Sequence, residues 1–454
     1  MQTSINPATG AVIRDYPVHT PQQVQKIIEQ GHACFLQWKK VPVTDRSAYL
    51  RKVNDVLLAK KDVFGRLISE EMGKTMKEAV TEVEKCAATA LYFAENGPNI
   101  LKNEHIVTEY SKSYVAFRPL GIVFGVMPWN FPFWQVLRFA LPSLMAGNVG
   151  ILKHASNTPG CALAIESVFR EAGLPEHAFQ SLLIPGSRVE EVISHPNVAA
   201  VTLTGSTPAG RSVAALSGKY LKKTVLELGG SDAYIVLADA DLEHAVKTIA
   251  ASRMLNCGQS CVSAKRLIVD ESLKERFEAG IVDIFSKQKI GDQFAPDSNV
   301  GPMSRVDLRD ELHDQVQRSI AQGARCLLGG TVPAGKGAFY PLTVLTDVKK
   351  GMAAYSEEMF GPVAVIIPAK NEEDAIAIAN DSVYGLGGAV FTRDTAHGEL
   401  IARERMDSGA CFVNMMVRSD PRLPFGGIKE SGYGRELAAF GMREFLNIKT
   451  IIVA

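Results

Sequence analysis

The chain has 454 residues, of which 46% are hydrophobic and 22% are charged, and this composition is ordinary for a globular protein of two or three domains. Lys and Arg together number 49, as do Asp and Glu, so the chain lacks the basic excess of a nucleic-acid-binding protein. No apolar run approaches the ~18 residues of a membrane span, and the N-terminus lacks a signal-peptide pattern. We therefore expect neither nucleic acid nor a membrane as a partner.

The seven cysteines form no disulfide pattern. Their number is odd and they are scattered along the chain. This usage is typical of free thiols in a reducing compartment, so we expect a cytoplasmic protein.

The first 100 residues are predicted to be mostly helical. Segments 20–40 and 44–73 place apolar residues at helical spacing, and Thr44 or Asp45 is suited to cap the second helix. Segment 104–130 is rich in β-branched and aromatic residues in alternation, which predicts strands.

From residue 121 onward, short apolar strands alternate with helices. The expected strands of the first block are 121–127, 149–153, 180–186, 198–206, 224–230 and 232–237. A second block follows, with strands at 266–270, 362–369, 387–394 and 410–416. This alternation predicts an α/β fold of two doubly wound, Rossmann-like units with a ligand cleft between them. The tail 446–454 is predicted to be an edge strand that another segment or chain must cover.

Two polar features follow predicted strands and suit a cofactor. Gly205 and Ser206 come between a strand and a helix, and Gly210 lets helix and loop approach closely. Lys153 stands at the carboxyl end of another strand, where ligands bind in open sheets. In isolation each feature has an ordinary alternative, namely a simple strand–helix connection and a solvated lysine.

Three further side chains suit covalent chemistry. Glu227 ends an apolar strand, where burial would raise its pKa and suit it to general-base work. Asn130 lies on a backbone constrained by Pro132 and has an amide that can donate to an oxyanion. Cys261 closes the stretch NCGQSC, in a predicted loop after a helix that Gly258 ends. The alternatives are a paired Glu, a turn Asn, and a redox pair of Cys257 with Cys261; a structural zinc site is excluded because the ligands are too few.

Taken together, these motifs resemble the NAD(P)-dependent aldehyde dehydrogenase superfamily. The matching stretches, in order, are PWNFP (128–132), LKHAS (152–156), GSTPAG (205–210), LELGG (226–230), NCGQSC (256–261), EEMFGP (357–362) and PFGGIKESGYGRE (424–436). The resemblance extends from residue 5 to the C-terminus.

The resemblance implies a role for each motif residue. Cys261 would be the nucleophile, Asn130 and the Cys261 N–H would hold the oxyanion, and Glu227 would activate the hydrolytic water. The implied cofactor contacts are Trp129, Lys153, Ser156, Gly205, Ser206, Gly229, Glu358 and Phe360. Within this set, Lys153 would hold the adenosine ribose, Ser206 the pyrophosphate, and Glu358 and Phe360 the nicotinamide end.

The family fold implies three parts. They are a cofactor domain (1–100 and 120–229), a catalytic domain (230–424) and a bridging sheet (101–119 and 440–454). The bridging sheet implies a homodimer or homotetramer.

Two departures from common family patterns bear on the cofactor and the substrate. Ser156 occupies a position where many NAD-preferring members carry Glu, so no carboxylate repels a 2′-phosphate and either NAD or NADP fits. Arg138 and Ser419 resemble residues of succinate-semialdehyde dehydrogenases, where a guanidinium would clamp a substrate carboxylate. Leu255 replaces a second Arg found in some of these enzymes, and Arg418 or Arg422 is a candidate substitute.

Several alternatives remain open from sequence. Lactaldehyde dehydrogenases also carry an Arg near position 138. A cysteine hydrolase would need a positioned His. A catalytically idle relative would not need Asn130, Glu227 and Cys261 together. A CoA-acylating relative usually lacks the base that Glu227 would provide.

Overall fold

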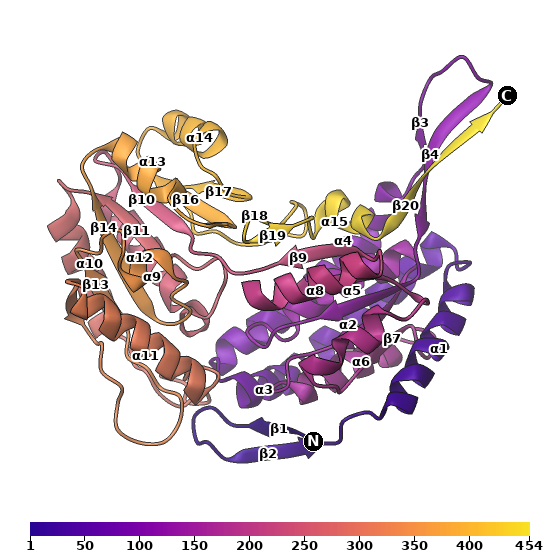
Figure 1. Ribbon diagram of the computed structural model, residues 1–454, viewed down its shortest axis with the longest axis horizontal. Helices are drawn as coiled ribbons and strands as arrows, with labels where there is room; N and C mark the ends of the chain where they lie inside the picture. The colour runs from indigo at the N-terminus through magenta and orange to yellow at the C-terminus, as the bar shows by residue number, and fades with distance from the viewer.

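The computed structural model describes all residues from 1 to 454 and shows two α/β bodies, each built around its own sheet, with a β arm projecting from one of them (Figure 1). This arrangement confirms the predicted α/β fold class.

The first sheet is parallel except at one edge, and its strand order is β19-β9-β8-β5-β6-β7. Its strands are β5 (Ile122–Val126), β6 (Val149–Lys153), β7 (Phe179–Ser181), β8 (Val198–Thr204), β9 (Lys223–Glu227) and the antiparallel β19 (Gly432–Tyr433). From β5 the chain winds outward through β6 and β7, then returns to place β8 on the other side of β5. The chain therefore reverses its winding direction between the neighbouring strands β5 and β8. This is the topological switch point, where open α/β sheets bind ligands.

Helices cover both faces of this sheet and give it one large apolar core. They are α1 (Pro21–Trp38), α2 (Val43–Ala59), α3 (Lys61–Met72), α4 (Met76–Ile100), α5 (Trp134–Ala146), α6 (Pro159–Glu171), α7 (Val189–Ile193), α8 (Thr207–Lys219) and α15 (Ala438–Glu444). The predicted helical character of the first 100 residues is confirmed. A hairpin of β1 (Gln2–Ile5) and β2 (Val12–Tyr16) precedes the helices and was not predicted.

The predicted cap of the second helix is wrong. Helix α2 begins at Val43, directly after Pro42, so Thr44 and Asp45 lie inside its first turn and no side chain caps it. Proline already fixes the backbone that a helix start requires.

The second sheet has the order β12-β13-β14-β11-β10-β16-β17 and a separate apolar core. Its strands are β10 (Ala233–Val236), β11 (Arg266–Asp270), β12 (Arg325–Leu328), β13 (Thr343–Thr346), β14 (Val363–Ala369), β16 (Gly387–Phe391) and β17 (Ala410–Val413); only β12 is antiparallel. The helices are α9 (Leu242–Met254), α10 (Lys274–Ser286), α11 (Val306–Ala321), α12 (Ala353–Ser356), α13 (Glu372–Asn380) and α14 (Thr395–Glu404). A small pair of strands, β15 (Tyr384–Gly385) and β18 (Ile428–Lys429), lies outside both sheets.

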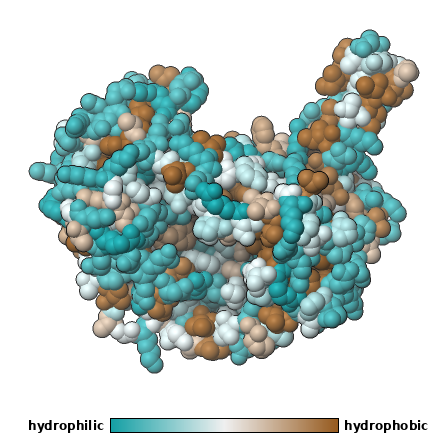
Figure 2. Space-filling model, in the orientation of Figure 1, coloured by the Kyte–Doolittle hydropathy of each residue, from teal (hydrophilic) through white to brown (hydrophobic).

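The arm consists of β3 (Glu104–His105), β4 (Lys112–Pro119) and β20 (Leu446–Val453), with β20 at its open edge. It extends away from the body and carries the C-terminus near its tip (Figure 1). Apolar side chains are visible along it (Figure 2). Ile448 and Ile452 on β20 are 59% and 53% exposed. The tail is thus an edge strand, as predicted.

None of the helices combines the length and the apolar character that crossing a membrane requires.

Candidate active site

The candidate residues of the first body follow the carboxyl ends of its parallel strands. Trp129 and Asn130 come after β5, and Gly205 and Ser206 come after its neighbour β8, so the two pairs flank the switch point. Glu227 is the last residue of β9. The topology therefore brings together motifs that are far apart in the sequence.

Two cavities meet at Cys261, which lines both of them together with Gln135. The larger, about 700 Å³, lies between α4, α5 and the loop around Ser419. The smaller, about 440 Å³, is lined among others by Trp129, Asn130, Gly205, Ser206, Gly229, Glu358 and Phe360. Cys261 therefore borders both cavities.

A constrained turn presents Cys261. Helix α9 ends at Met254, and Asn256, Cys257 and Gly258 follow with φ values of 57°, 54° and 70°. A side chain at Gly258 would place its Cβ 2.2 Å from the Gly361 carbonyl oxygen, so only glycine fits there. The backbone N–H of Asn256 donates to Glu78 Oε1 at 2.7 Å, which fixes the turn to the start of α4.

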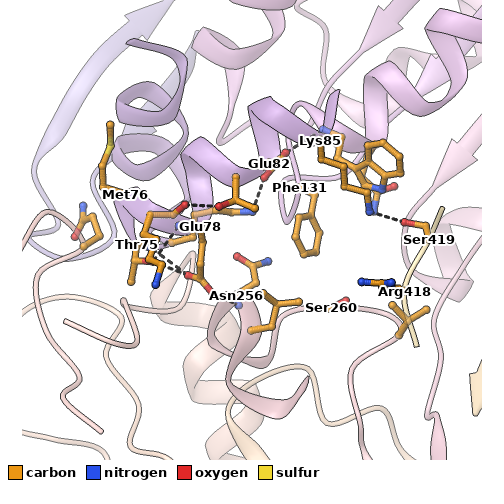
Figure 3. Close-up of a pocket in the computed structure, with 18 of the residues that line it drawn as sticks. Thr75, Met76, Glu78, Glu82, Lys85, Phe131, Asn256, Ser260, Arg418 and Ser419 are labelled. Carbon is orange, nitrogen blue, oxygen red and sulfur yellow. Dashed lines mark hydrogen bonds and ion pairs between the residues drawn. The ribbon is translucent and has the colours of Figure 1, made fainter. Parts of the chain in front are cut away.

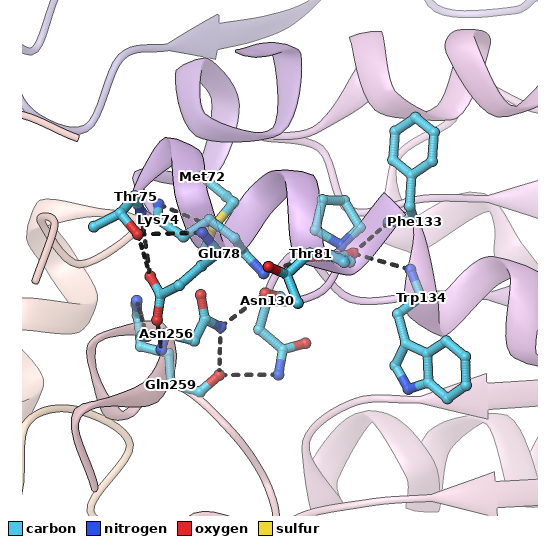
Figure 4. A network of polar contacts seen from close by, with 12 residues as sticks. Met72, Lys74, Thr75, Glu78, Thr81, Asn130, Phe133, Trp134, Asn256 and Gln259 are labelled. Atoms are coloured by element: carbon cyan, nitrogen blue, oxygen red, sulfur yellow. Dashed lines mark hydrogen bonds and ion pairs between the residues drawn. The ribbon is translucent and has the colours of Figure 1, made fainter. Parts of the chain in front are cut away.

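Asn130 is held against this turn by hydrogen bonds (Figure 4). Its Nδ2 donates to the Gln259 carbonyl at 3.1 Å, and Asn256 Nδ2 donates to the Asn130 carbonyl at 2.8 Å. The Asn130 side chain is buried and borders the smaller cavity. Its amide is consequently fixed close to the backbone that leads into Cys261.

Cys261 is a protonated thiol in this resting arrangement. Burial raises its pKa to about 12, opposed by the positive charges of Lys265 and Arg138. Lys265 is buried, and its Nζ donates to the Cys261 carbonyl at 2.7 Å and pairs with Glu358 at 3.0 Å. Lys265 was not among the predicted residues because a lone lysine before a strand carries no sequence signal.

Glu227 is buried beneath the site and borders neither cavity. Neither of its carboxylate oxygens has a hydrogen-bond partner. Burial, and secondly the neighbouring Glu436, raise its pKa well above the usual range. The surroundings of Glu227 therefore favour its protonated form, and contact with water would favour the carboxylate that a base requires.

The two cysteines of NCGQSC lie in different surroundings. Cys257 is fully buried in the second core, where burial raises its pKa, whereas Cys261 is partly exposed. Both thiols are free. The two cysteines are therefore close in sequence, but only Cys261 lines the cavities.

The smaller cavity reaches the N-terminus of helix α8. Ser206 is the N-cap of α8 but makes no side-chain capping bond, so the N–H groups of the first turn are available to a phosphate. A Cβ at Gly210 would lie 2.4 Å from Leu228, which explains the predicted close approach of helix and loop. At the other end, Trp129 and Phe360 meet edge to face with ring centroids 5.8 Å apart.

Lys153 and Ser156 lie elsewhere. Lys153 is the last residue of β6 and Ser156 follows in the next loop, and neither borders the smaller cavity. Burial lowers the Lys153 pKa, and Ser156 is exposed at a separate cavity beside Arg188 and Arg305.

Arg138 and Ser419 both line the larger cavity. Arg138 is almost fully buried: it forms an ion pair with Glu436, and its Nη2 donates to Thr204 at 3.3 Å. Of the two candidate substitutes for the missing second arginine, Arg418 borders the cavity, whereas Arg422 pairs with Asp420 and does not.

Comparison with known proteins gives consistent matches over the full length. The model of the aldehyde dehydrogenase family matches residues 1–451. A probable NADP+-dependent succinate-semialdehyde dehydrogenase of Synechocystis sp. is 45% identical over 99% of each chain. The crystal structure of Streptococcus pyogenes succinic semialdehyde dehydrogenase in complex with NADP+ superposes with a TM-score of 0.98 at 36% identity, over 100% of both chains. A solved lactaldehyde dehydrogenase gives 0.96 at 32% identity, over 99% of this chain and 95% of the other.

Proposed function

The chain belongs to the aldehyde dehydrogenase family, and on this premise we propose that it oxidises succinate semialdehyde to succinate with NADP+. The observation that carries the proposal is the position of Cys261 between two cavities. One cavity carries cationic groups suited to a carboxylate-bearing aldehyde. The other ends at a helix N-terminus suited to a pyrophosphate.

Cys261 is the proposed nucleophile. The Cys261 thiol passes its proton to water in the cavity, and the resulting thiolate attacks the aldehyde carbon to form a thiohemiacetal, whose oxyanion accepts hydrogen bonds from Asn130 Nδ2 and the Cys261 N–H. The hydrogen bonds to Gln259 and Asn256 hold the Asn130 amide in place before substrate arrives. Lys265, through its contact with the Cys261 carbonyl, fixes the backbone from which the thiol projects.

Glu227 is the proposed general base for hydrolysis of the thioester. When bound, NADP+ supplies the hydride acceptor. Glu227 must reach the water from its buried position beside Glu436, and Gly426 leaves room next to its carboxylate because it carries no side chain. The Cβ that Gly426 lacks would lie 2.7 Å from Glu227 Oε1. Because its pKa is raised, the base becomes more available as pH increases.

The cofactor contacts are proposed as the resemblance implies. Ser206 and Gly205 receive the pyrophosphate at α8, and Glu358 and Phe360, with Trp129 and Gly229, surround the nicotinamide end. Lys153 and Ser156 take the adenosine ribose and its 2′-phosphate, since Ser156 adds no negative charge there. The NADP+ in the names of the two succinate-semialdehyde dehydrogenases supports this assignment.

Arg138 and Ser419 are the proposed contacts of the substrate carboxylate. Arg138 Nη1 donates no hydrogen bond within the protein and is the group proposed to be available to a ligand. Lactaldehyde is the second candidate substrate, supported by the similar solved lactaldehyde dehydrogenase. It carries a hydroxyl instead of a carboxylate, so a cationic cavity favours succinate semialdehyde over it.

We also propose a homodimer or homotetramer in the cytoplasm, with the sheet of residues 101–119 and 440–454 as the contact. The unpaired edge of β20 and its exposed Ile448 and Ile452 support the contact, and the seven free cysteines support the compartment.

The test is an assay of the purified enzyme by absorbance of the reduced cofactor. Succinate semialdehyde, its methyl ester and lactaldehyde are compared, each with NADP+ or NAD+ and with or without CoA. We expect the highest kcat/KM with succinate semialdehyde and NADP+, and no dependence on CoA. A preference for lactaldehyde or a requirement for CoA would refute the proposal.

A further inference from the structure

One cation of the larger cavity has no carboxylate to neutralise it. Lys85 lies on α4, is half-buried, and has no acidic oxygen within ion-pair distance. Its Nζ donates to Ser419 Oγ at 2.8 Å and lies 3.9 Å from the centroid of the Trp134 ring. Figure 3 shows the lysine reaching Ser419, with Arg418 beside it at the same end of the cavity.

The other buried charges around the cavity are already paired. Lys74 pairs with Glu82 at 2.5 Å, and both side chains are almost fully buried. Arg138 pairs with Glu436. Glu82 also accepts the N–H groups of Phe133 and Trp134, and Glu78 is bound to the Cys261 turn. Lys85 therefore gives this end of the cavity a positive charge that no protein group cancels.

A partly buried ammonium without a counter-ion is costly, and it is stabilised when an anion binds. Burial lowers the Lys85 pKa to about 8, and the positive charge of Arg138 is the second cause. The negative charges of Glu82 and Asp420 act in the opposite direction but do not restore the usual pKa. The Trp134 ring and the Ser419 hydroxyl orient the ammonium, but neither supplies negative charge. An anionic ligand would complete the site.

We propose that Lys85, oriented by Ser419 and Trp134, is the main electrostatic anchor for the carboxylate of the substrate and determines specificity for an ω-carboxylated aldehyde. This inference rests on the proposed function and deepens it. Arg138 contributes Nη1 to the same carboxylate, but its charge is already balanced by Glu436, so it adds a hydrogen bond more than an attraction. Arg418, which is exposed, adds a screened charge at the rim.

The test compares Lys85→Met with Lys85→Arg. Methionine keeps the apolar stem against Trp134 and removes the charge, whereas arginine keeps the charge. With succinate semialdehyde we expect Lys85→Met to raise KM roughly 10–100-fold with little change in kcat, the loss typical of a charge-assisted hydrogen bond. With the uncharged methyl ester of the same aldehyde KM should change by less than about twofold. Lys85→Arg should recover most of the affinity.

Two further variants control the comparison. Lys77→Met removes an exposed lysine of the same helix at the rim of the cavity, and we expect less than about a twofold effect with either substrate because the charge is solvated. Ser419→Ala leaves Lys85 in place but removes its partner, and we expect a smaller rise in KM that is again confined to the charged substrate. If Lys85→Met does not fold, Ser419→Ala is the deciding variant. A Ser419→Ala enzyme whose KM values for succinate semialdehyde and the methyl ester change equally overturns the proposal.

Binding of succinate, measured by calorimetry, separates the anchor from the proposed function. Suppose that the wild-type enzyme prefers succinate semialdehyde. If Lys85→Met then changes the KM for succinate semialdehyde by less than about twofold, or raises the KM values for succinate semialdehyde and its methyl ester equally, the anchor is refuted and the proposed function stands. If succinate binds to the wild-type enzyme and not to Lys85→Met, yet succinate semialdehyde is a poor substrate, the anchor stands and the proposed substrate is wrong.

Discussion

The guanidinium of Arg138 and the carboxylate of Glu436 form an ion pair in which both side chains are almost completely buried, at 2% and 3% exposure. The pair joins α5 to the segment between β19 and α15, and the Arg138 guanidinium also lies 4.7 Å from the Phe425 ring. Glu227 is next to this pair, since Glu436 raises its pKa and Arg138 lowers it. One buried pair thus links the wall of the larger cavity to the proposed base.

Removing Arg138 alone should destabilise the protein. Arg138→Ala leaves Glu436 buried and unpaired, and we expect a loss of about 3–5 kcal/mol in the free energy of unfolding. The double variant Arg138→Ala/Glu436→Gln should recover a large part of this loss because no lone charge remains. Urea denaturation measures the free energy of unfolding of both variants. If Arg138→Ala is as stable as the wild type, Arg138 does not neutralise a buried charge on Glu436.

The same single variant tests the contact between Arg138 and the substrate. We expect Arg138→Ala to raise KM for succinate semialdehyde more than for its methyl ester, since Nη1 is the available donor. Steady-state kinetics at a temperature where the variant is folded provide the comparison. Equal effects on both substrates would restrict Arg138 to its structural role.

Asn130→Ala should lower kcat by ~10²–10³-fold with little effect on KM, because in the proposed mechanism the amide stabilises the oxyanion in the transition state and not the bound aldehyde. The matched control is Cys257→Ala, in the NCGQSC stretch that Asn130 contacts but within the second core, which should retain activity. An Asn130→Ala enzyme with unchanged turnover would remove Asn130 from the mechanism.

Ser156→Glu should change the cofactor preference. A carboxylate at this position would repel the 2′-phosphate of NADP+, so we expect roughly a 10–100-fold rise in KM for NADP+ and little change for NAD+. Ser156→Gln, of the same size without charge, controls for steric effects. A rise that is equal for both cofactors, or absent, would place the 2′-phosphate elsewhere.

The Lys85 anchor should also be visible in the pH dependence. Because the Lys85 pKa is lowered to about 8, its charge is present below pH 8 and is lost as pH rises above it. The charged groups that set this value are Arg138 on α5, Glu82 on α4 and Asp420 after Ser419, with Cys86 also on α4. We expect the ratio of kcat/KM for succinate semialdehyde to that for the methyl ester to fall above pH 8. The ratio cancels the titration of Cys261 and Glu227, which act on both substrates, and a constant ratio in Lys85→Arg is the control.

The sequence predicts the parts of this enzyme whose signals are local. The strand–turn–helix at Gly205–Gly210, the loop position of Cys261 and the edge strand at the C-terminus all follow from spacing, glycine positions and β-branched residues. The N-terminal hairpin is not predicted because β2 is mostly exposed and β1 buries the polar Gln2 and Ser4, so neither strand shows an apolar alternation.

The residues that depend on tertiary packing could not be predicted. Lys85 looks like any solvated lysine on a helix, and only the packing of α4 near Trp134 and Ser419 turns it into the cavity. Lys265 and Glu436 are likewise ordinary charged residues until the fold buries them beside Cys261 and Glu227. Charge partners distant in sequence leave no local pattern.

The most direct test of the central claim is mass spectrometry of the Glu227→Gln enzyme after one exposure to succinate semialdehyde and NADP+. Without its base, the enzyme should form about one equivalent of reduced cofactor per subunit and then stop, with a succinyl group bound to Cys261. Continued turnover, or a protein that forms reduced cofactor with Cys261 unmodified at every time, would contradict a reaction in which Cys261 carries the acyl group and Glu227 activates the water.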